Sequence, residues 1–317
     1  MRRLPLFAAA AFLALLAAGC GSERQSAPPR PTPTTTLAGA PPAGERTVTD
    51  MAGRQVALPG RVERVVVLSP SAADYAAAFG LEVIGRPSDV PVPESARTVG
   101  SSLAPDFPAI AALQPDLVLA DALTQGARIP DFDRFTLPVY LIAAADYRAI
   151  LEAIDRLGEA LDRTGRAAEL RAEIESRVTA AALAARQARD RLGPRRVLVL
   201  TGEGRDVFAA GAESYIGNLV SILAADNAAA SPPEGGPLRG FGVIDPGAAA
   251  ALQPDVVLIL PAGQGTLEAQ LRADPAWAAT PALRSGRIAT LDRTLFLRAP
   301  GPRIAEAVET LQRIIWQ

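Results

Sequence analysis

Apolar segments without polar interruptions alternate with segments of helical periodicity along most of this 317-residue chain. Residues 64–80, RVVVLSPSAADYAAAFG, have the pattern of a buried strand, a short turn and a helix that a glycine ends. Residues 195–204, RRVLVLTGEG, begin a second unit of the same kind. The segments LVLA and VVLIL, at 117–120 and 256–260, do not alternate, which is typical of parallel strands covered on both faces. We therefore predict an α/β protein with two Rossmann-like lobes and parallel-rich sheets.

A five-letter phrase, ALQPD, occurs twice, at 112–116 and 251–255, and one of these apolar segments follows each copy. Asp106 and Asp245 lie at the same distance ahead of the two copies. Each fits the N-cap of a helix of one or two turns that the Gln-Pro pair then ends. Chance is the alternative explanation, since Pro-Asp before a strand is common. The five identical letters and the matched aspartates favour duplication or a shared architecture, with one copy in each lobe.

Residues 163–193 have the pattern of one long helix between the lobes, and a Gly-Pro pair ends it. At 1.5 Å per residue this helix is about 43 Å long, enough to join two lobes by a rigid connection that allows only small closing motions. We expect an N-terminal lobe at 47–162 and a C-terminal lobe at 194–317 that closes with a helix over 301–316. The apolar stripe that predicts the long helix consists of Leu170, Ile174, Val178, Ala181, Ala185, Ala188 and Leu192.

The composition excludes several familiar kinds of catalysis. The sequence has no histidine and no lysine, which excludes Ser-His-Asp triads, imidazole zinc sites, Walker lysines and Schiff bases. Its single cysteine excludes an internal disulfide and a thiolate metal cluster. The formal net charge of −2 gives no reason to expect nucleic acid as a partner. No acidic pair stands outside helix caps and amphipathic helix faces, so an exported enzyme is a weak alternative, and we expect no enzyme, no resident metal and no cofactor.

The N-terminal end has the features of an export signal followed by a tether. Two arginines precede an apolar run that is short for a membrane span, and small residues lead to Cys20. This end resembles the lipobox of bacterial lipoproteins, in which the cysteine carries acyl chains, although Ala17 stands where leucine is usual. We predict a signal peptide with a lipobox at 1–20 and a Pro-rich tether at 21–46. A secretory signal with a cysteine nearby by accident is the alternative.

The succession of export signal, tether, lobe, long helix and lobe resembles the iron-siderophore/haem/cobalamin class of periplasmic substrate-binding proteins of ABC importers. Besides both ALQPD units, the matching phrases are VTDMAGRQVALPGRVERVVVLSPS at 48–71, GAESYIGNLVSILAADNAA at 211–229 and LRAPGPRIAEAV at 297–308. The resemblance implies an exported, lipid-anchored protein that holds a metal chelate or corrinoid between its lobes and hands it to an ABC transporter permease. We also expect a monomer.

One departure from this family concerns the permease. In the family, the helix that leads into each such unit carries a glutamate two residues after its N-cap, and the two glutamates dock on permease arginines. Here Pro108 and Gly247 occupy these positions, unless Asp106 and Asp245 substitute for the glutamates. A sensory or scaffolding lipoprotein without permease coupling is therefore an alternative. Direct metal-ion binding, as in the related manganese and zinc binders, is weaker because those proteins rely on histidine.

Ligands of doubly wound sheets bind beyond the carboxyl ends of the strands, where loops lead into helix N-termini. Serines there suit an oxygen-rich ligand, arginines suit anionic groups, and aromatic rings suit a planar ligand. Each arginine, taken singly, fits a solvated or salt-bridged surface position better than a ligand contact, and Tyr215 fits a core position equally well. Arg239 and Phe241 are the first choices, because the Gly-rich pattern around them gives no packing reason for an aromatic ring. The predicted ligand-binding residues are Ser69, Pro70, Ser71, Ser101, Ser102, Arg205, Tyr215, Arg239, Phe241, Arg293 and Arg298.

Overall fold

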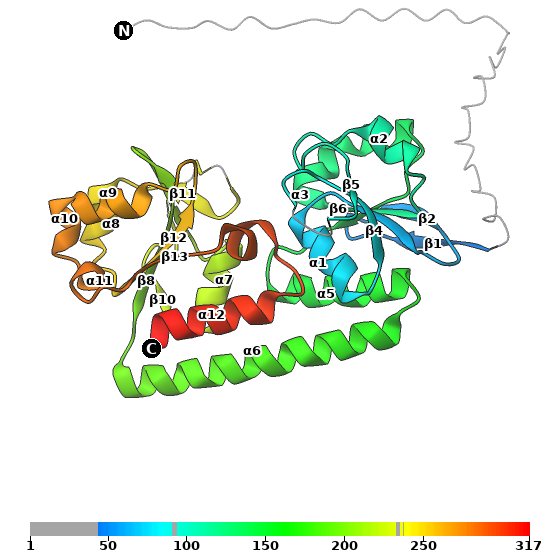
Figure 1. Ribbon diagram of the computed structural model, residues 1–317. Helices are drawn as coiled ribbons and strands as arrows, with labels where there is room; N and C mark the ends of the chain where they lie inside the picture. The colour runs from blue at the N-terminus through cyan, green and yellow to red at the C-terminus, as the bar shows by residue number, and fades with distance from the viewer. Residues whose placement is uncertain (1–43, 91–93, 233–234, 237) are drawn as a thin grey trace, which may run out of the picture. The chain divides into compact units, whose positions relative to one another are not determined.

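The N-terminal lobe is built on a parallel five-stranded sheet in the order β5-β4-β3-β6-β7 (Figure 1). The computed structural model describes residues 44–90, 94–232, 235–236 and 238–317, so the predicted signal peptide, Cys20 and nearly all of the tether lie outside the described residues. The strands are β3 Arg64–Val67, β4 Glu82–Arg86, β5 Arg97–Thr98, β6 Leu117–Asp121 and β7 Val139–Ile142. The helices are α1 Pro70–Ala78, α2 Phe107–Ala112, α3 Ala122–Gln125, α4 Ile129–Arg134 and α5 Tyr147–Ala160.

The C-terminal lobe is built on a mixed six-stranded sheet in the order β11-β9-β8-β12-β13, with β10 beside the start of β8. Strands β8, β10, β12 and β13 pair in parallel, whereas β9 and β11 pair antiparallel. The predicted fold of two α/β lobes with parallel-rich sheets is confirmed. The strands are β8 Arg196–Glu203, β9 Asp206–Ala210, β10 Asp226–Asn227, β11 Phe241–Val243, β12 Val256–Pro261 and β13 Ile288–Thr290. The helices are α7 Tyr215–Ile222, α8 Pro246–Ala251, α9 Leu267–Ala273, α10 Pro275–Ala278, α11 Pro281–Arg284, the π-helix η2 Thr294–Arg298 and α12 Ile304–Trp316.

The two ALQPD copies form the same structure. Asp106 caps α2 by accepting a hydrogen bond from the Ala109 N–H, and Asp245 caps α8 in the same way. Two residues after each short helix ends, a glutamine has a positive φ, +48° at Gln114 and +47° at Gln253. Both glutamines therefore adopt the left-handed conformation that reverses the chain before proline. The predicted caps and the predicted stop are confirmed at both sites.

The aspartate that ends each copy fastens the following strand to the opening strand of its lobe. The Asp116 carboxylate accepts hydrogen bonds from the N–H groups of Glu63 and Arg64, at 2.9 and 2.8 Å. The Asp255 carboxylate accepts one from Arg196 at 2.8 Å. These bonds set the register in which β6 pairs with β3 and β12 with β8. The repeated phrase therefore encodes a complete local unit of helix, reversal and strand attachment.

The long helix α6 runs from Thr164 to Leu192, within the bounds that its apolar stripe predicts. It lies along both α5 and α12, so it contacts both lobes (Figure 1). Six of the seven predicted stripe residues are buried, but Leu192 is 48 % exposed. Its prediction as a core position is wrong because Leu192 is the last helical residue and lies beyond the surface that α12 covers. The final helix starts at Ile304 rather than Gly301, since residues 301–303 form a turn.

A hairpin of β1 Glu45–Thr49 and β2 Gln55–Pro59 precedes the N-terminal sheet. The fully buried Asp50 turns the hairpin by accepting hydrogen bonds from the N–H groups of Ala52 and Arg54. A backbone bond from the Met51 N–H to the Leu141 carbonyl joins it to β7. Strand β1, the first element of the described chain, begins at Glu45.

One large apolar cluster continues from the N-terminal lobe across α6 and α12 into β8, β12 and α7 of the C-terminal lobe. Each sheet buries its other face against a smaller cluster within its own lobe. The lobes thus share packing on one side. Among the helices of the described ranges, none has both the length and the apolar content needed to cross a bilayer.

Candidate functional site

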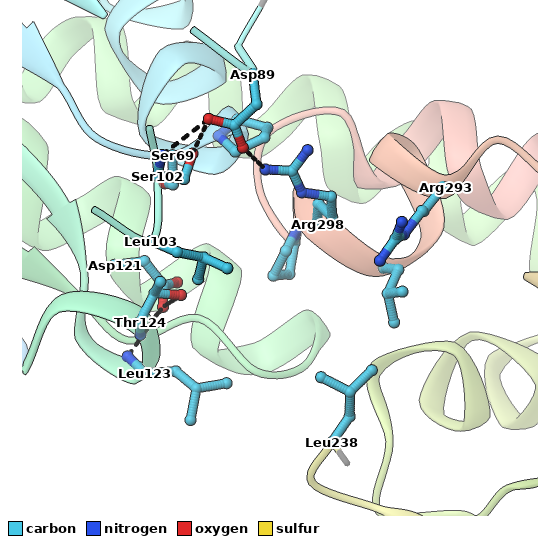
Figure 2. Close-up of a pocket in the computed structure, with 13 residues that line it drawn as sticks. Ser69, Asp89, Ser102, Leu103, Asp121, Leu123, Thr124, Leu238, Arg293 and Arg298 are labelled. Atoms are coloured by element: carbon cyan, nitrogen blue, oxygen red, sulfur yellow. Dashed lines mark hydrogen bonds and ion pairs between the residues drawn. The ribbon is translucent and has the colours of Figure 1, made fainter. Parts of the chain in front are cut away.

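A cavity of about 490 Å³ lies where the two lobes face each other. Figure 2 shows that side chains from both lobes point into it, with Leu123 and Leu238 approaching from opposite sides. This volume falls within the range of sites for small molecules. The lining residues are Ser69, Pro70, Asp89, Ser102, Leu103, Asp121, Leu123, Thr124, Leu238, Arg293, Leu297, Arg298 and Pro300.

The N-terminal lobe reaches the cleft through the carboxyl ends of its strands. Ser69 and Pro70 follow β3, Asp89 follows β4, and Ser102 follows β5. Asp121 is the last residue of β6. Parallel strands place these ends at one edge of the sheet, which explains why residues so far apart in the sequence meet there. The N-terminal wall of the cleft thus follows the rule that ligands bind beyond the carboxyl ends of parallel strands.

A buried glutamine holds three of these segments together. Gln125, at the end of α3, is 1 % exposed. Its Nε2 donates hydrogen bonds to the carbonyl oxygens of Leu68, at 3.2 Å, and Ser102, at 2.8 Å. Its Oε1 accepts a hydrogen bond from the Asp121 N–H at 2.8 Å. Because one amide satisfies polar backbone groups after β3, β5 and β6, it fixes the spacing of the cleft wall.

A second cavity, of about 410 Å³, extends the first. The two cavities share Asp121, Leu123, Leu238, Leu297 and Pro300, so they are parts of one cleft. The residues 143–145, which follow β7, add to its N-terminal wall. The C-terminal lobe adds Glu213, Tyr215, Arg239 and Phe241. A third cavity, of about 480 Å³, lies next to it and shares Glu213, Arg239 and Phe241.

The ionised groups of the cleft fall into paired and unpaired sets. Asp89 accepts hydrogen bonds at Oδ1 from the N–H of Ser102, at 2.8 Å, and from its hydroxyl, at 3.1 Å, and its Oδ2 pairs with Arg298 (Figure 2). Burial acts to raise the pKa of the Asp89 carboxyl, but the bonds from Ser102 and Arg298 together hold the pKa below its usual value. The side chains of Arg293 and Arg239 make no hydrogen bond or ion pair within the part of the chain that the structure describes.

Asp121 has a different environment from Asp89. Its carboxylate caps α3 by accepting hydrogen bonds from the N–H groups of Leu123 and Thr124. Burial raises the pKa of the Asp121 carboxyl, although these hydrogen bonds act in the opposite direction. Burial and the charge of Asp74 likewise raise the pKa of Tyr215, so its hydroxyl stays protonated. The Asp121 carboxyl is therefore a polar part of the cleft wall, whereas the Tyr215 hydroxyl is buried without a hydrogen-bond partner among the described residues. The arginines supply the positive charge of the cleft.

Eight of the eleven predicted ligand-binding residues line the cleft. Ser69, Pro70, Ser102, Arg293 and Arg298 line the first cavity, and Tyr215, Arg239 and Phe241 line the second. Phe241 is also 7 % exposed and belongs to the large apolar cluster, so the expectation that it lacks a packing role is wrong. Arg293 directly precedes the π-helix η2 and Arg298 is its last residue, so this segment is not a loop.

The other three predicted residues line none of the cavities described above. Ser71 is buried and its hydroxyl donates to the Pro300 carbonyl, which joins the two lobes beside the cleft. The Ser101 hydroxyl accepts from the Ala104 N–H and so closes a turn. Arg205 lies in the tight turn between β8 and the antiparallel strand β9, where the chain turns back from the cleft. The carboxyl-end rule fails there because β9 is antiparallel.

Sequence reasoning missed Asp89, Gln125 and several leucines. Leu103 and Leu123 are 81 % and 79 % exposed although both are large apolar residues. With Leu238 and Leu297 they give the cleft an apolar surface. An exposed leucine in a loop after a strand carries a weak sequence signal, because apolar loop residues are common. The sequence contains no signal for Asp89 or Gln125, since their partners lie on other segments.

The residues present fit the binding of an organic ligand better than that of a bare metal ion. Across residues 44–317, apart from the six undescribed positions, no three of the His, Cys, Asp and Glu side chains come close enough to hold a metal ion. The cleft instead combines guanidinium groups, hydroxyls and apolar side chains, which suit a ligand with both anionic and apolar parts.

Comparisons with known proteins agree with this fold. The family model described as "Periplasmic binding protein" matches residues 65–295, well over half of the chain. A comparison with curated proteins gives no match. Among solved structures, the periplasmic haem-binding protein RhuT from Roseiflexus sp. RS-1 is 26 % identical, with a TM-score of 0.66 over 80 % of this chain and 98 % of that chain.

Two further structures are similar at lower identity. A periplasmic haem-binding protein from Pseudomonas aeruginosa is 23 % identical, with a TM-score of 0.68 over 80 % of this chain and 93 % of that chain. SirA from Staphylococcus aureus, solved with staphyloferrin B, is 16 % identical, with a TM-score of 0.68 over 85 % and 98 % of the two chains. The family that the sequence resembles is thereby confirmed. This chain belongs to the periplasmic binding protein family, whose members are extracytoplasmic binding proteins rather than enzymes.

Proposed function

We propose that this protein captures an iron-siderophore, haem or cobalamin-type ligand in the cleft between its lobes and delivers it to an ABC transporter. The observation that carries the proposal is a cleft that both lobes line and in which Arg239 and Arg293 have no protein partner among the described residues. An unpaired guanidinium beside apolar side chains is suited to a carboxylate, hydroxamate or catecholate of an organic ligand. The haem and siderophore ligands named for similar structures have this character.

The lining residues also bear on the metal of such a ligand. Within the described lining of the two connected cavities there is no histidine, cysteine or methionine, and the hydroxyl of Tyr215 is buried without a hydrogen-bond partner among the described residues. A chelate that supplies all of its own metal ligands therefore fits best.

Native mass spectrometry of the purified protein tests this function. The protein is incubated with ferric citrate, ferrioxamine B, haem or cyanocobalamin. We expect a one-to-one complex with one of them, in which the mass of the ligand is unchanged. The variants Arg239→Gln and Arg293→Gln should each weaken an anionic ligand about tenfold, as expected for the loss of one charge-assisted hydrogen bond. Turnover of the ligand, or no complex with any of the four, would contradict ligand capture.

The membrane anchor is part of the same proposal. Cys20 lies outside the described residues, and its support is the resemblance of the N-terminal end to a lipobox. Several acyl chains on this cysteine would hold the protein at a membrane, because each buried methylene contributes about 0.8 kcal/mol. We expect Cys20→Ser to move the protein from the membrane fraction to the soluble fraction. Retention of this variant in the membrane fraction would contradict acylation of Cys20.

A sensory or scaffolding lipoprotein without permease coupling is the second candidate. Pro108 and Gly247 favour it, since both stand where the resemblance leads us to expect docking glutamates. Asp106 and Asp245, the alternative docking groups, already use one carboxylate oxygen as helix caps. The double variant Asp106→Asn/Asp245→Asn keeps both caps, because asparagine caps a helix as well as aspartate does. Lost transport with normal ligand binding would assign the aspartates to docking, and normal transport would leave them as caps only.

A further inference from the structure

Asp89 and Arg298 form an ion pair between the two lobes inside the first cavity. Asp89 follows β4 of the N-terminal lobe, and Arg298 ends the π-helix η2 of the C-terminal lobe. Figure 2 shows the carboxylate and the guanidinium meeting at the upper side of the cavity that both residues line. The pair therefore occupies a position that a bound ligand would also reach.

Asp89 is oriented by its own lobe and not only by Arg298. One carboxylate oxygen, Oδ1, is held by the N–H and the hydroxyl of Ser102. The carbonyl of Ser102 is in turn held by the buried amide of Gln125. The other oxygen, Oδ2, is left to extend towards the opposite lobe, where it meets Arg298. An acid fixed in this way presents a carboxylate to Arg298 as a ligand would.

Arg293 gives the contrast. It lies five residues before Arg298 on the same segment and lines the same cavity, but it makes no hydrogen bond or ion pair with any residue that the structure describes. The side chains of Arg298 and Asp89 remain 30 % and 36 % exposed. Water and solutes reach the pair, and ion pairs exposed to this extent are weak. An anionic solute can therefore displace the carboxylate of Asp89.

We propose that Asp89 is an internal competitor for the ligand, whose carboxylate occupies Arg298 across the cleft in the ligand-free protein until a carboxylate or similar oxyanion of the ligand replaces it. This inference rests on the proposed ligand capture and adds a selection rule to it. A ligand without an anionic group leaves the Asp89–Arg298 pair intact and has to bind beside it. A ligand with such a group gains Arg298, but its apparent affinity is reduced by the fraction of molecules in which Asp89 holds the guanidinium.

Hydrogen–deuterium exchange of the ligand-free protein tests the pair without any ligand. The variant Asp89→Asn keeps the shape and the Ser102 contacts of the side chain but removes its charge. We expect amide exchange in residues 294–300 to rise about two- to fivefold, the range expected for the loss of one exposed ion pair. Arg298→Gln should give the same rise, and Arg293→Gln, which removes a charge from the same segment without touching the pair, should give none. Exchange in Asp89→Asn equal to that of the wild type would overturn the proposal.

Binding measurements then test the competition. For ferric citrate and haem, which carry carboxylates, Asp89→Asn should bind about two- to fivefold more tightly than the wild type. For ferrioxamine B, which is cationic, the variant should bind no more tightly. Equal tightening for all bound probes, or none for a bound carboxylate probe, would overturn the competition while ligand capture stands. If none of the probes binds the wild type, capture itself is wrong, and raised exchange would then mark the pair as a structural contact only.

Discussion

The N-terminal ALQPD unit leads through β6 into a short helix that carries Gln125 into the interior, whereas the C-terminal unit leads through β12 into an exposed turn that contains Gln264. The two glutamines are 139 positions apart, the same spacing as the two copies of the phrase. Gln125 bonds to three segments of the cleft wall, but Gln264 uses its backbone N–H to contact the Glu203 carboxylate. The same scaffold therefore carries a cleft wall in one lobe and a surface turn in the other.

The difference follows from the directions of the neighbouring strands. In the N-terminal sheet, every strand is parallel, so all carboxyl ends meet at the cleft. In the C-terminal sheet, β8 turns directly into the antiparallel strand β9, and the turn meets the segment after β12 through Glu203 and Thr266. The C-terminal side of the cleft is built instead from Glu213 and Tyr215 after β9, from residues 238–241 at the start of β11, and from residues after β13. A repeat in sequence thus indicates a shared scaffold, while strand direction decides where the site lies.

Replacing each of the two glutamines should give the largest difference in the free energy of unfolding between the two lobes. Gln125→Ala leaves the Leu68 and Ser102 carbonyls and the Asp121 N–H without their partner in a buried environment. Orphaned buried groups cost about 1–3 kcal/mol each, so we expect the free energy of unfolding to fall by about 3 kcal/mol. Gln264→Ala should change it by less than about 0.5 kcal/mol, as is usual at an exposed position. Urea denaturation measures both, and equal losses for the two variants would contradict the assignment of Gln125 as the residue that holds the cleft wall.

Much of the fold could be predicted because its signals are local. Strand burial, the caps at Asp106 and Asp245 and the stripe along α6 each depend on residues within one or two turns of each other. The errors lie at the ends of elements. Leu192 fits the stripe but is 48 % exposed, and the last helix begins at Ile304 because residues 301–303 form a turn. The apolar periodicity of one helix or strand does not show whether a second element covers it.

The candidate site could be predicted only in part, for the same physical reason. The carboxyl-end rule finds Ser69 and Ser102 because it depends on strand direction, which the apolar pattern indicates. It places Arg205 wrongly because nothing in the residues 196–204 shows that the next strand returns antiparallel. Asp89 and Gln125 act through partners distant in sequence, so a single sequence contains no signal for them.

Helices α1 and α7 also differ between the lobes. Each presents a polar side chain where the lobes meet, but the two side chains differ in charge. On α7, the side-chain amide oxygen Oδ1 of Asn218 accepts a hydrogen bond from the Tyr147 N–H at 3.1 Å. On α1, the carboxyl oxygen Oδ2 of Asp74 is buried and has no hydrogen-bond partner among the described residues. Burial raises the pKa of Asp74 to about 6, with Arg303 acting against the rise and Glu306 adding to it. The N-terminal lobe thus has a titratable group where the C-terminal lobe has an amide.

The pH dependence of Asp74 follows from the direction of this shift. Below about pH 4 the carboxyl is protonated in both the folded and the unfolded chain, so it has no effect on stability. Between about pH 4 and pH 6 the folded protein retains a proton that the unfolded chain has lost. The free energy of unfolding therefore falls as the pH rises towards the folded pKa of about 6, and it is constant above that pH. We expect Asp74→Asn to be more stable than the wild type by about 2 kcal/mol at pH 7 and equal to it near pH 4. A constant difference in urea denaturation between pH 4 and pH 7 would contradict a raised pKa.

The smallest effect should come from the aspartates that end the two ALQPD units. Asp116 accepts hydrogen bonds from two backbone N–H groups and Asp255 from one, and all of these bonds are exposed. We expect Asp116→Ala to lower the free energy of unfolding by about 2 kcal/mol and Asp255→Ala by about 1 kcal/mol, since exposure places each bond near the low end for charge-assisted hydrogen bonds. Asp116→Asn keeps one acceptor oxygen without the charge and should fall between the wild type and the alanine variant. A larger loss for Asp255→Ala would show that the C-terminal sheet depends on this attachment more than its number of hydrogen bonds indicates, and that the two units share a structure without sharing its energetics.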